Sequence, residues 1–100
     1  MLNSKQSAFL RGLAYRIDTI LIVGKGEITD NIIKQADDAL TAREIIKGKV
    51  LENSAYSSRE AAEAIAEKCS ADVVQVIGSK FVLYRRNDDE PVIELPKAKK

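Results

Sequence analysis

Apolar residues recur with two different periods along the chain, and the three-to-four-residue period predicts three amphipathic helices. The first covers about residues 4–17, the second begins near residue 28 and ends near Arg43, and the third covers about residues 57–69. The residues of the three stripes are Phe9, Leu10, Leu13, Ala14 and Ile17; Ile28, Ile32, Ile33, Ala36, Ala39 and Leu40; and Ala62, Ile65, Ala66 and Cys69. The expected caps are Asn3 or Ser4, Thr29 or Asp30, and Ser57, with Glu60 completing a capping box.

Short apolar runs between these helices predict four strands, at residues 19–23, 45–51, 73–77 and 80–85. The last two are separated only by Gly78-Ser79, which suits a type II′ hairpin turn. Strands joined through helices tend to run parallel, whereas a hairpin is antiparallel. The sequence therefore predicts a compact α/β domain of order α-β-α-β-α-β-β, with a mixed four-stranded sheet packed on helices. Three helices cover only one face fully, so we expect the other face to be partly exposed.

Alternation within the strands assigns side chains to the two faces of the sheet. Lys47 and Lys49 share one face, and Ile46 and Val50 share the other. The two-residue turn sets Ile77 opposite Lys80 and Val76 opposite Phe81. This register predicts a core side with Val74, Val76, Phe81 and Leu83, and an opposite side with Gln75, Lys80, Tyr84, Val73, Ile77 and Val82.

Composition narrows the possible chemistry. With 100 residues and 45% hydrophobic residues, the chain suits one domain. It has no histidine, so the usual catalytic base and zinc ligand are missing. Its single cysteine, Cys69, lies in an apolar stripe, and we therefore expect it to be buried with a structural role. No apolar run approaches the ~20 residues that span a bilayer, and the first residues lack a signal-peptide layout. We expect a cytoplasmic protein that is not an enzyme and uses no cofactor or metal.

The most distinctive local feature is Gly24-Lys25-Gly26, between a strand and a helix N-terminus. Glycines let the backbone approach a ligand, free amides and the helix dipole favour an anion, and Lys25 adds a full charge. The loop is neither a Walker motif nor a dinucleotide-binding GxGxxG. It predicts a phosphate-binding loop, although a β-to-α turn that needs glycine for its backbone angles has the same sequence.

Other basic residues extend this candidate surface. They are Lys47 and Lys49 on the second strand and Arg85 and Arg86 at the end of the fourth, although lysines on a half-exposed strand are also ordinary surface design. Without Lys97, Lys99 and Lys100, the chain has 13 basic and 15 acidic residues, a net charge of −2. Attraction to a polyanion must therefore come from a local patch of basic residues. Three tyrosines are candidates for stacking on bases, although packing is the more common role of a tyrosine at a strand end or on a helix face: Tyr15, Tyr56 and Tyr84.

Four segments, in this order and spacing, resemble the CRM domain (chloroplast RNA splicing and ribosome maturation), in the stand-alone bacterial YhbY form. They are Leu2-Asn3-Ser4-Lys5-Gln6 with Leu10 and Ala14; Gly24-Lys25-Gly26; Ile45-Ile46-Lys47-Gly48-Lys49-Val50; and Val74-Gln75-Val76-Ile77-Gly78 with Leu83-Tyr84-Arg85. The resemblance covers nearly all of residues 2–86. It implies a fold similar to the C-terminal domain of translation initiation factor three, with a CRM-type RNA-binding domain over residues 1–87. Residues 88–100 would form a flexible basic tail.

The resemblance also implies a function, binding of ribosomal RNA in precursors of the large ribosomal subunit. The family's RNA contact, usually a GKGG loop, falls on Gly24, Lys25 and Gly26, while Glu27 stands in place of the last glycine. Gly48 replaces the usual branched residue between the two lysines, which predicts a thinner core there.

We therefore expect a monomeric RNA-binding protein without a membrane or small-molecule partner. The predicted RNA-binding residues are Gly24, Lys25, Gly26, Lys47, Lys49, Arg85 and Arg86. The alternative is a protein-interaction module that docks on a ribosomal protein or assembly factor through an exposed sheet face carrying Val73, Ile77 and Val82. A nucleotide-handling enzyme is disfavoured because the motif, the magnesium ligands and a catalytic base are all lacking.

Overall fold

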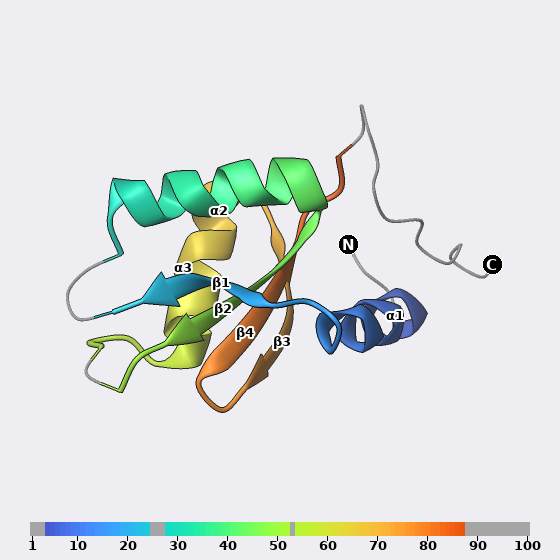
Figure 1. Cartoon of the computed structure of the whole chain (residues 1–100), viewed down its shortest axis with the longest axis horizontal. Coiled ribbons are helices and arrows are strands. Elements are labelled where there is room, and N and C mark those ends of the chain that lie inside the picture. Colours follow the sequence, from blue (N-terminus) through green and yellow to red (C-terminus); the bar gives the residue numbers. More distant parts are fainter. Residues whose placement is uncertain (1–3, 25–27, 53, 88–100) are drawn as a thin grey trace.

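The order of helices and strands is the expected one (Figure 1). A computed structural model describes residues 4–24, 28–52 and 54–87 of the chain. Its elements are α1 (Ser4–Ala14), β1 (Thr19–Val23), α2 (Asp30–Arg43), β2 (Ile45–Val50), α3 (Ser58–Cys69), β3 (Asp72–Ile77) and β4 (Lys80–Tyr84). The predicted tail, residues 88–100, lies outside the described residues.

The four strands form one mixed sheet in the order β1-β2-β4-β3. β1 and β2 run parallel across the connection through α2, whereas β4 is antiparallel to both β2 and β3. In the hairpin, Val76 pairs with Phe81 and Ile77 with Lys80, as predicted. Gly78 has a φ of 57°, the positive value that a type II′ turn requires at its first central residue, while Ser79 has no positive φ. The predicted mixed sheet is confirmed.

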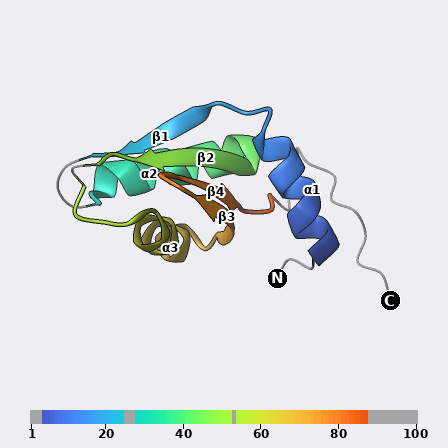
Figure 2. The same cartoon turned by 90° about the horizontal axis from the view of Figure 1, so that it is seen from below.

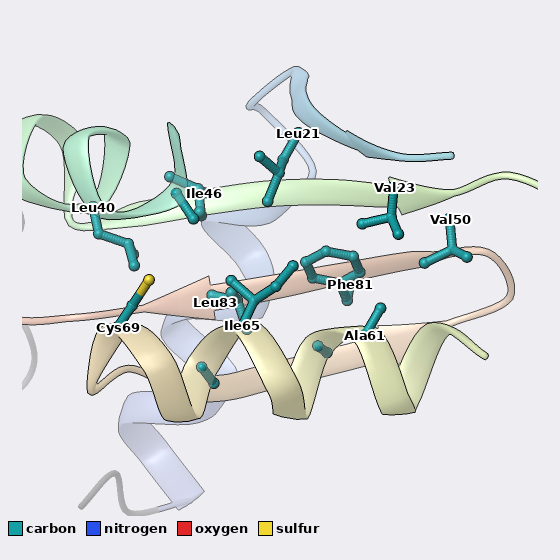
Figure 3. Close-up of a cluster of buried hydrophobic side chains, with 13 residues drawn as sticks. Leu21, Val23, Leu40, Ile46, Val50, Ala61, Ile65, Cys69, Phe81 and Leu83 are labelled. Atoms are coloured by element: carbon teal, nitrogen blue, oxygen red, sulfur yellow. The ribbon is translucent and has the colours of Figure 1, made fainter. Parts of the chain in front are cut away.

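Helices α2 and α3 cover one face of the sheet and enclose the main core. The buried residues of this cluster come from both helices and from β1, β2 and β4. Figure 3 shows the Phe81 ring between the strands and α3, close to Ile65. Gly48 lies opposite Phe81 on the neighbouring strand, and the ring occupies the place that a side chain at residue 48 would take. The expected thinner core at Gly48 was therefore wrong, because the larger partner fills the space.

Helix α1 packs on the opposite face of the sheet, so that face is only partly exposed. Leu10 and Ala14 of α1 form a second cluster with buried side chains from the strands, among them Val82 and Tyr84. Figure 1 shows α1 apart from α2 and α3, and Figure 2 shows it beside one end of the sheet. The apolar docking face expected in the alternative function does not form as predicted. That prediction required Val73, Ile77 and Val82 to be open to solvent. Val82 is only 4% exposed, and of the three only Ile77, at 58%, is open to solvent.

A β-bulge changes the faces of β3 relative to the prediction. Gln75 pairs with Val82 and Val73 with Leu83, so Val74 is the extra residue between them. Val74 consequently packs in the α1 cluster, and Val73 packs against the main core. The sequence-based assignment of Val74 to the core side and Val73 to the opposite side was wrong, because strict alternation does not hold across a bulge.

The helix ends follow local capping chemistry. The Thr29 hydroxyl accepts a hydrogen bond from the Ile32 amide at 3.3 Å, which selects Thr29 from the two expected caps. Ser57 and Glu60 form the predicted capping box at the start of α3. Helix α1 ends three residues earlier than predicted, at Ala14. There the Arg16 amide donates to the Leu13 carbonyl at 2.9 Å in a tighter turn, although Ile17 still packs against the α1 cluster.

Candidate nucleic-acid interface

The first glycine of the predicted phosphate loop follows β1 at one end of the sheet. Gly24 is half-buried there, beside Leu51. The Leu51 amide donates to the Val23 carbonyl at 2.9 Å, and the Val50 amide donates to the Ser79 carbonyl at 2.7 Å. These bonds bring the start of the loop, the end of β2 and the hairpin turn together. Lys25 and Gly26, like Glu27, lie outside the described residues, so their role in anion binding stays a prediction.

Three lysines share the sheet face on which α1 packs, and we call Lys47, Lys49 and Lys80 the lysine face. Lys47 and Lys49 are half-buried and Lys80 is exposed. Lys49 and Lys80 are direct cross-strand partners of β2 and β4. Like charges directly opposite one another destabilise a sheet, so this arrangement favours a bound anion.

The lysine face has no internal counter-charge in the part of the chain that the structure describes. The three ion pairs found there join Lys34 to Asp38, Arg59 to Glu63 and Arg85 to Asp37. The first two lie on the outer surfaces of α2 and α3, where they are well exposed. Among the described residues, none of the three lysines of the lysine face is in an ion pair.

A cleft of about 230 Å³ opens between α1 and the sheet beside the lysine face. Its described lining residues include no carboxylate; they are Arg11, Ala14, Tyr15, Lys47, Gln75, Ile77, Lys80, Phe81 and Val82. Lys80 and Arg11 are absent from the site predicted by sequence. The hairpin register already set Lys80 on the correct face and could have identified it. Arg11 joins the cleft only through the docking of α1, for which the local sequence has no signal.

The structure does not place Arg85 with the lysines. Arg85 follows β4 at the end opposite Lys80, and only 22% of its side chain is exposed. The guanidinium donates to the Cys69 carbonyl at 2.9 Å, the Asp37 carbonyl at 2.9 Å and the Thr41 hydroxyl at 2.7 Å, and it also pairs with the Asp37 carboxylate. These bonds tie the end of β4 to α2 and to the end of α3. Arg85 therefore has a structural role here, and its RNA contact, like that of the exposed neighbouring Arg86, stays a prediction.

Two of the remaining candidate side chains, Tyr84 and Cys69, are buried. Tyr84 is 3% exposed in the α1 cluster, so its ring is not open to stacking, whereas Tyr15 is 80% exposed. Cys69 is buried at the end of α3, and this burial raises the pKa of its thiol, with the Asp37 charge adding to the effect. A raised pKa disfavours the reactive thiolate, which agrees with the expected structural role.

Two further features are absent from the described residues. Acidic, cysteine and histidine side chains form no cluster there that could hold a metal ion. Over the same residues, no helix combines the length and the apolar character needed to cross a membrane.

Together these features define a small α/β domain with helices on both faces of its sheet and a group of cations on one of these faces. The sequence of residues 2–85 matches the family described as the CRS1/YhbY (CRM) domain. The chain belongs to this family, as the motifs predicted. Family membership also confirms that it is not an enzyme.

Individual relatives match almost the whole chain. It is 44% identical over 96 residues to a probable RNA-binding protein of Bacillus subtilis, YqeI, covering 96% of this chain and 100% of that one. An RNA-binding protein of Haemophilus influenzae is 33% identical over 96 residues, with 96% of each chain covered. Among solved structures, the hypothetical protein SAV1595 of Staphylococcus aureus, described as a candidate RNA-binding protein, superposes with a TM-score of 0.79. It has 48% sequence identity, and the match covers 96% of this chain and 100% of that one.

Proposed function

We propose that this protein binds ribosomal RNA in precursors of the large ribosomal subunit, as a cytoplasmic monomer without a cofactor. The observation that carries the proposal is the lysine face, where Lys49 and Lys80 stand directly opposite each other without an internal counter-charge in the described residues. The RNA-binding names of relatives that match nearly the full length support the choice of RNA as the polyanion. The resemblance to the stand-alone YhbY form supports the choice of ribosomal RNA.

The proposed contacts are made mainly to the RNA backbone. We expect Lys25 and the backbone amides of Gly24 and Gly26, which precede α2 in the sequence, to hold one phosphate. Lys47 and Lys49 hold further phosphates along the sheet. Backbone contacts position an RNA without reading its bases, so the expected binding depends on RNA shape and on salt more than on sequence.

The proposed surface does not include Arg85, which follows β4 at the end opposite Lys80. The guanidinium of Arg85 has four intramolecular hydrogen bonds and is not needed to explain the proposal. Glu27 adds a negative charge beside the proposed phosphate site. We therefore expect Glu27→Gly, which restores the glycine usual in the family, to tighten binding.

The test is the binding of fluorescently labelled fragments of large-subunit ribosomal RNA precursors, measured by anisotropy. Lys47→Ala/Lys49→Ala is compared with Lys34→Ala/Lys68→Ala, which also removes two charges but from the exposed surfaces of α2 and α3. We expect the first pair to weaken binding roughly tenfold or more, because it removes two charge-assisted phosphate contacts. The control pair should change binding little. Lys25→Ala tests the loop separately.

Two results would contradict the proposal. If the wild type binds none of the precursor fragments, ribosomal RNA is not the ligand. If the two double variants bind equally well, the affinity does not come from the lysine face. Association with a ribosomal protein that survives nuclease treatment would then favour the protein-docking alternative.

A further inference from the structure

We propose that the cleft between α1 and the sheet accepts one unpaired nucleotide of the RNA, with its base stacked on Tyr15. This inference rests on the proposed function and specifies the kind of RNA that the same surface takes. The phosphates on either side of that nucleotide would be held by Arg11, Lys47 and Lys80, which all line the cleft.

Tyr15 differs from the other tyrosines in the packing of its ring. Tyr84 is buried against α1, and Tyr56 packs partly against the main core. Tyr15 is 80% exposed, although it lines the cleft and follows directly after the last residue of α1. Its ring therefore contributes little to the folded core. An exposed aromatic ring beside cations is the arrangement on which single-stranded nucleic acids stack their bases.

The size and lining of the cleft suit one flat group. Its volume of about 230 Å³ is below the ~300–1,000 Å³ of usual small-molecule pockets, so it suits a single base better than a whole cofactor. Ala14 and Ile77 give apolar surface, and Ile77 is 58% exposed. The half-buried Gln75 presents an amide that can both donate and accept hydrogen bonds at a base edge.

The charges around the cleft distinguish a nucleotide from an uncharged aromatic ligand. Three cations line it, while the described lining residues carry no acidic side chain. Arg11 approaches from α1, and Lys47 and Lys80 approach from neighbouring strands of the sheet. Cations on both sides of the cleft complement the phosphates that precede and follow a nucleotide. A base within a duplex is stacked between its neighbours and cannot enter, so the geometry selects unpaired RNA.

The experiment compares two labelled RNA duplexes, each made of two annealed strands, which are identical except that one carries a single-stranded 3′ overhang of about six nucleotides. Affinities are measured for the wild type, Tyr15→Leu and Tyr15→Phe. We expect the wild type to prefer the overhang RNA roughly tenfold, since stacking of one base accounts for a factor of that size. Tyr15→Leu should abolish the preference without weakening binding to the blunt duplex, which has no unpaired nucleotide to stack. Tyr15→Phe, which retains the ring, should preserve it.

Failure of this inference is distinguishable from failure of the proposed function. Equal wild-type affinity for the two duplexes, or a preference that survives Tyr15→Leu, would overturn nucleotide stacking while leaving phosphate binding by the lysine face intact. Equal loss on both RNAs in Tyr15→Leu would also overturn it, because stacking affects only the overhang. A wild type that binds the precursor fragments but neither duplex would overturn nucleotide stacking alone, and one that binds none of these RNAs would overturn both proposals. Circular dichroism spectra of the variants verify that each is folded.

Discussion

At the scale of single residues, the contact between Gly48 and Phe81 leads to a prediction about stability. A Cβ atom at residue 48 would clash with Cζ of Phe81 and lie 2.6 Å from its Cε1, and the ring is 1% exposed. Neither the ring nor the paired strands can move aside freely. Gly48→Ala should therefore lower the free energy of unfolding by about 1–3 kcal/mol, the usual cost of overpacking a core. Urea denaturation measures the change.

Gly12 offers the matched control for this substitution. A Cβ there would meet no atom within 4 Å, and the residue lies inside α1. Gly12→Ala should therefore stabilise the protein by about 0.5–1 kcal/mol through the better helix propensity of alanine. In the Gly48→Ala background, Phe81→Leu should recover part of the lost stability. If Gly48→Ala alone proved neutral, the close packing of Phe81 over β2 would be refuted.

At the scale of elements, the capping box of α3 makes part of the stability depend on pH. Hydrogen bonds from the backbone and side chain of Ser57 lower the pKa of Glu60 from its ordinary value of 4.5. A carboxyl whose pKa is lower in the folded state stabilises that state above the unfolded pKa. This contribution is lost as the pH falls through the folded pKa. Thermal unfolding of wild type and Glu60→Gln across pH should show the wild type more stable near neutrality, with the difference shrinking below about pH 4.5.

A difference between these proteins that stayed constant down to pH 2 would show that the Glu60 charge has no part in the cap. Ser57→Ala gives an independent measure of the same element. It removes the hydroxyl that accepts from the Glu60 amide at 3.1 Å, and the loss of such a cap costs about 1 kcal/mol.

Local patterns predicted the elements well because their causes are local. The capping box at Ser57 and the Gly78-Ser79 turn are both set by a few neighbouring residues, and both were predicted. The bulge at Val74 was missed since valines at residues 73 and 74 suit either face of a buried strand. Only their packing against α1 on one side and the main core on the other decides which valine points where.

At the scale of the whole molecule, the candidate surface combines predicted and unpredicted parts. Strand alternation predicted that Lys47 and Lys49 share a face, and the structure confirms it by burying Ile46 and Val50 on the opposite one. The cleft with Arg11 and Tyr15 was not predicted, because it exists only where α1 meets the sheet. The neutralised charge of Arg85 was missed for the same reason, since its partners on α2 lie more than forty positions away in sequence.

The cations of the proposed RNA-binding surface predict how the affinity for RNA depends on salt concentration. If about four phosphates are neutralised, the single-strand coefficient of about 0.7 per phosphate gives a slope of log affinity on log salt near −3. Lys47→Ala/Lys49→Ala should reduce the steepness by about 1.4, since two of these contacts are lost. Lys34→Ala/Lys68→Ala should leave it unchanged, although the net charge falls equally. Binding titrations over a salt series give the slopes. A slope near zero, or equal slopes for the two double variants, would mean that the lysine face does not displace counterions and that RNA is held elsewhere.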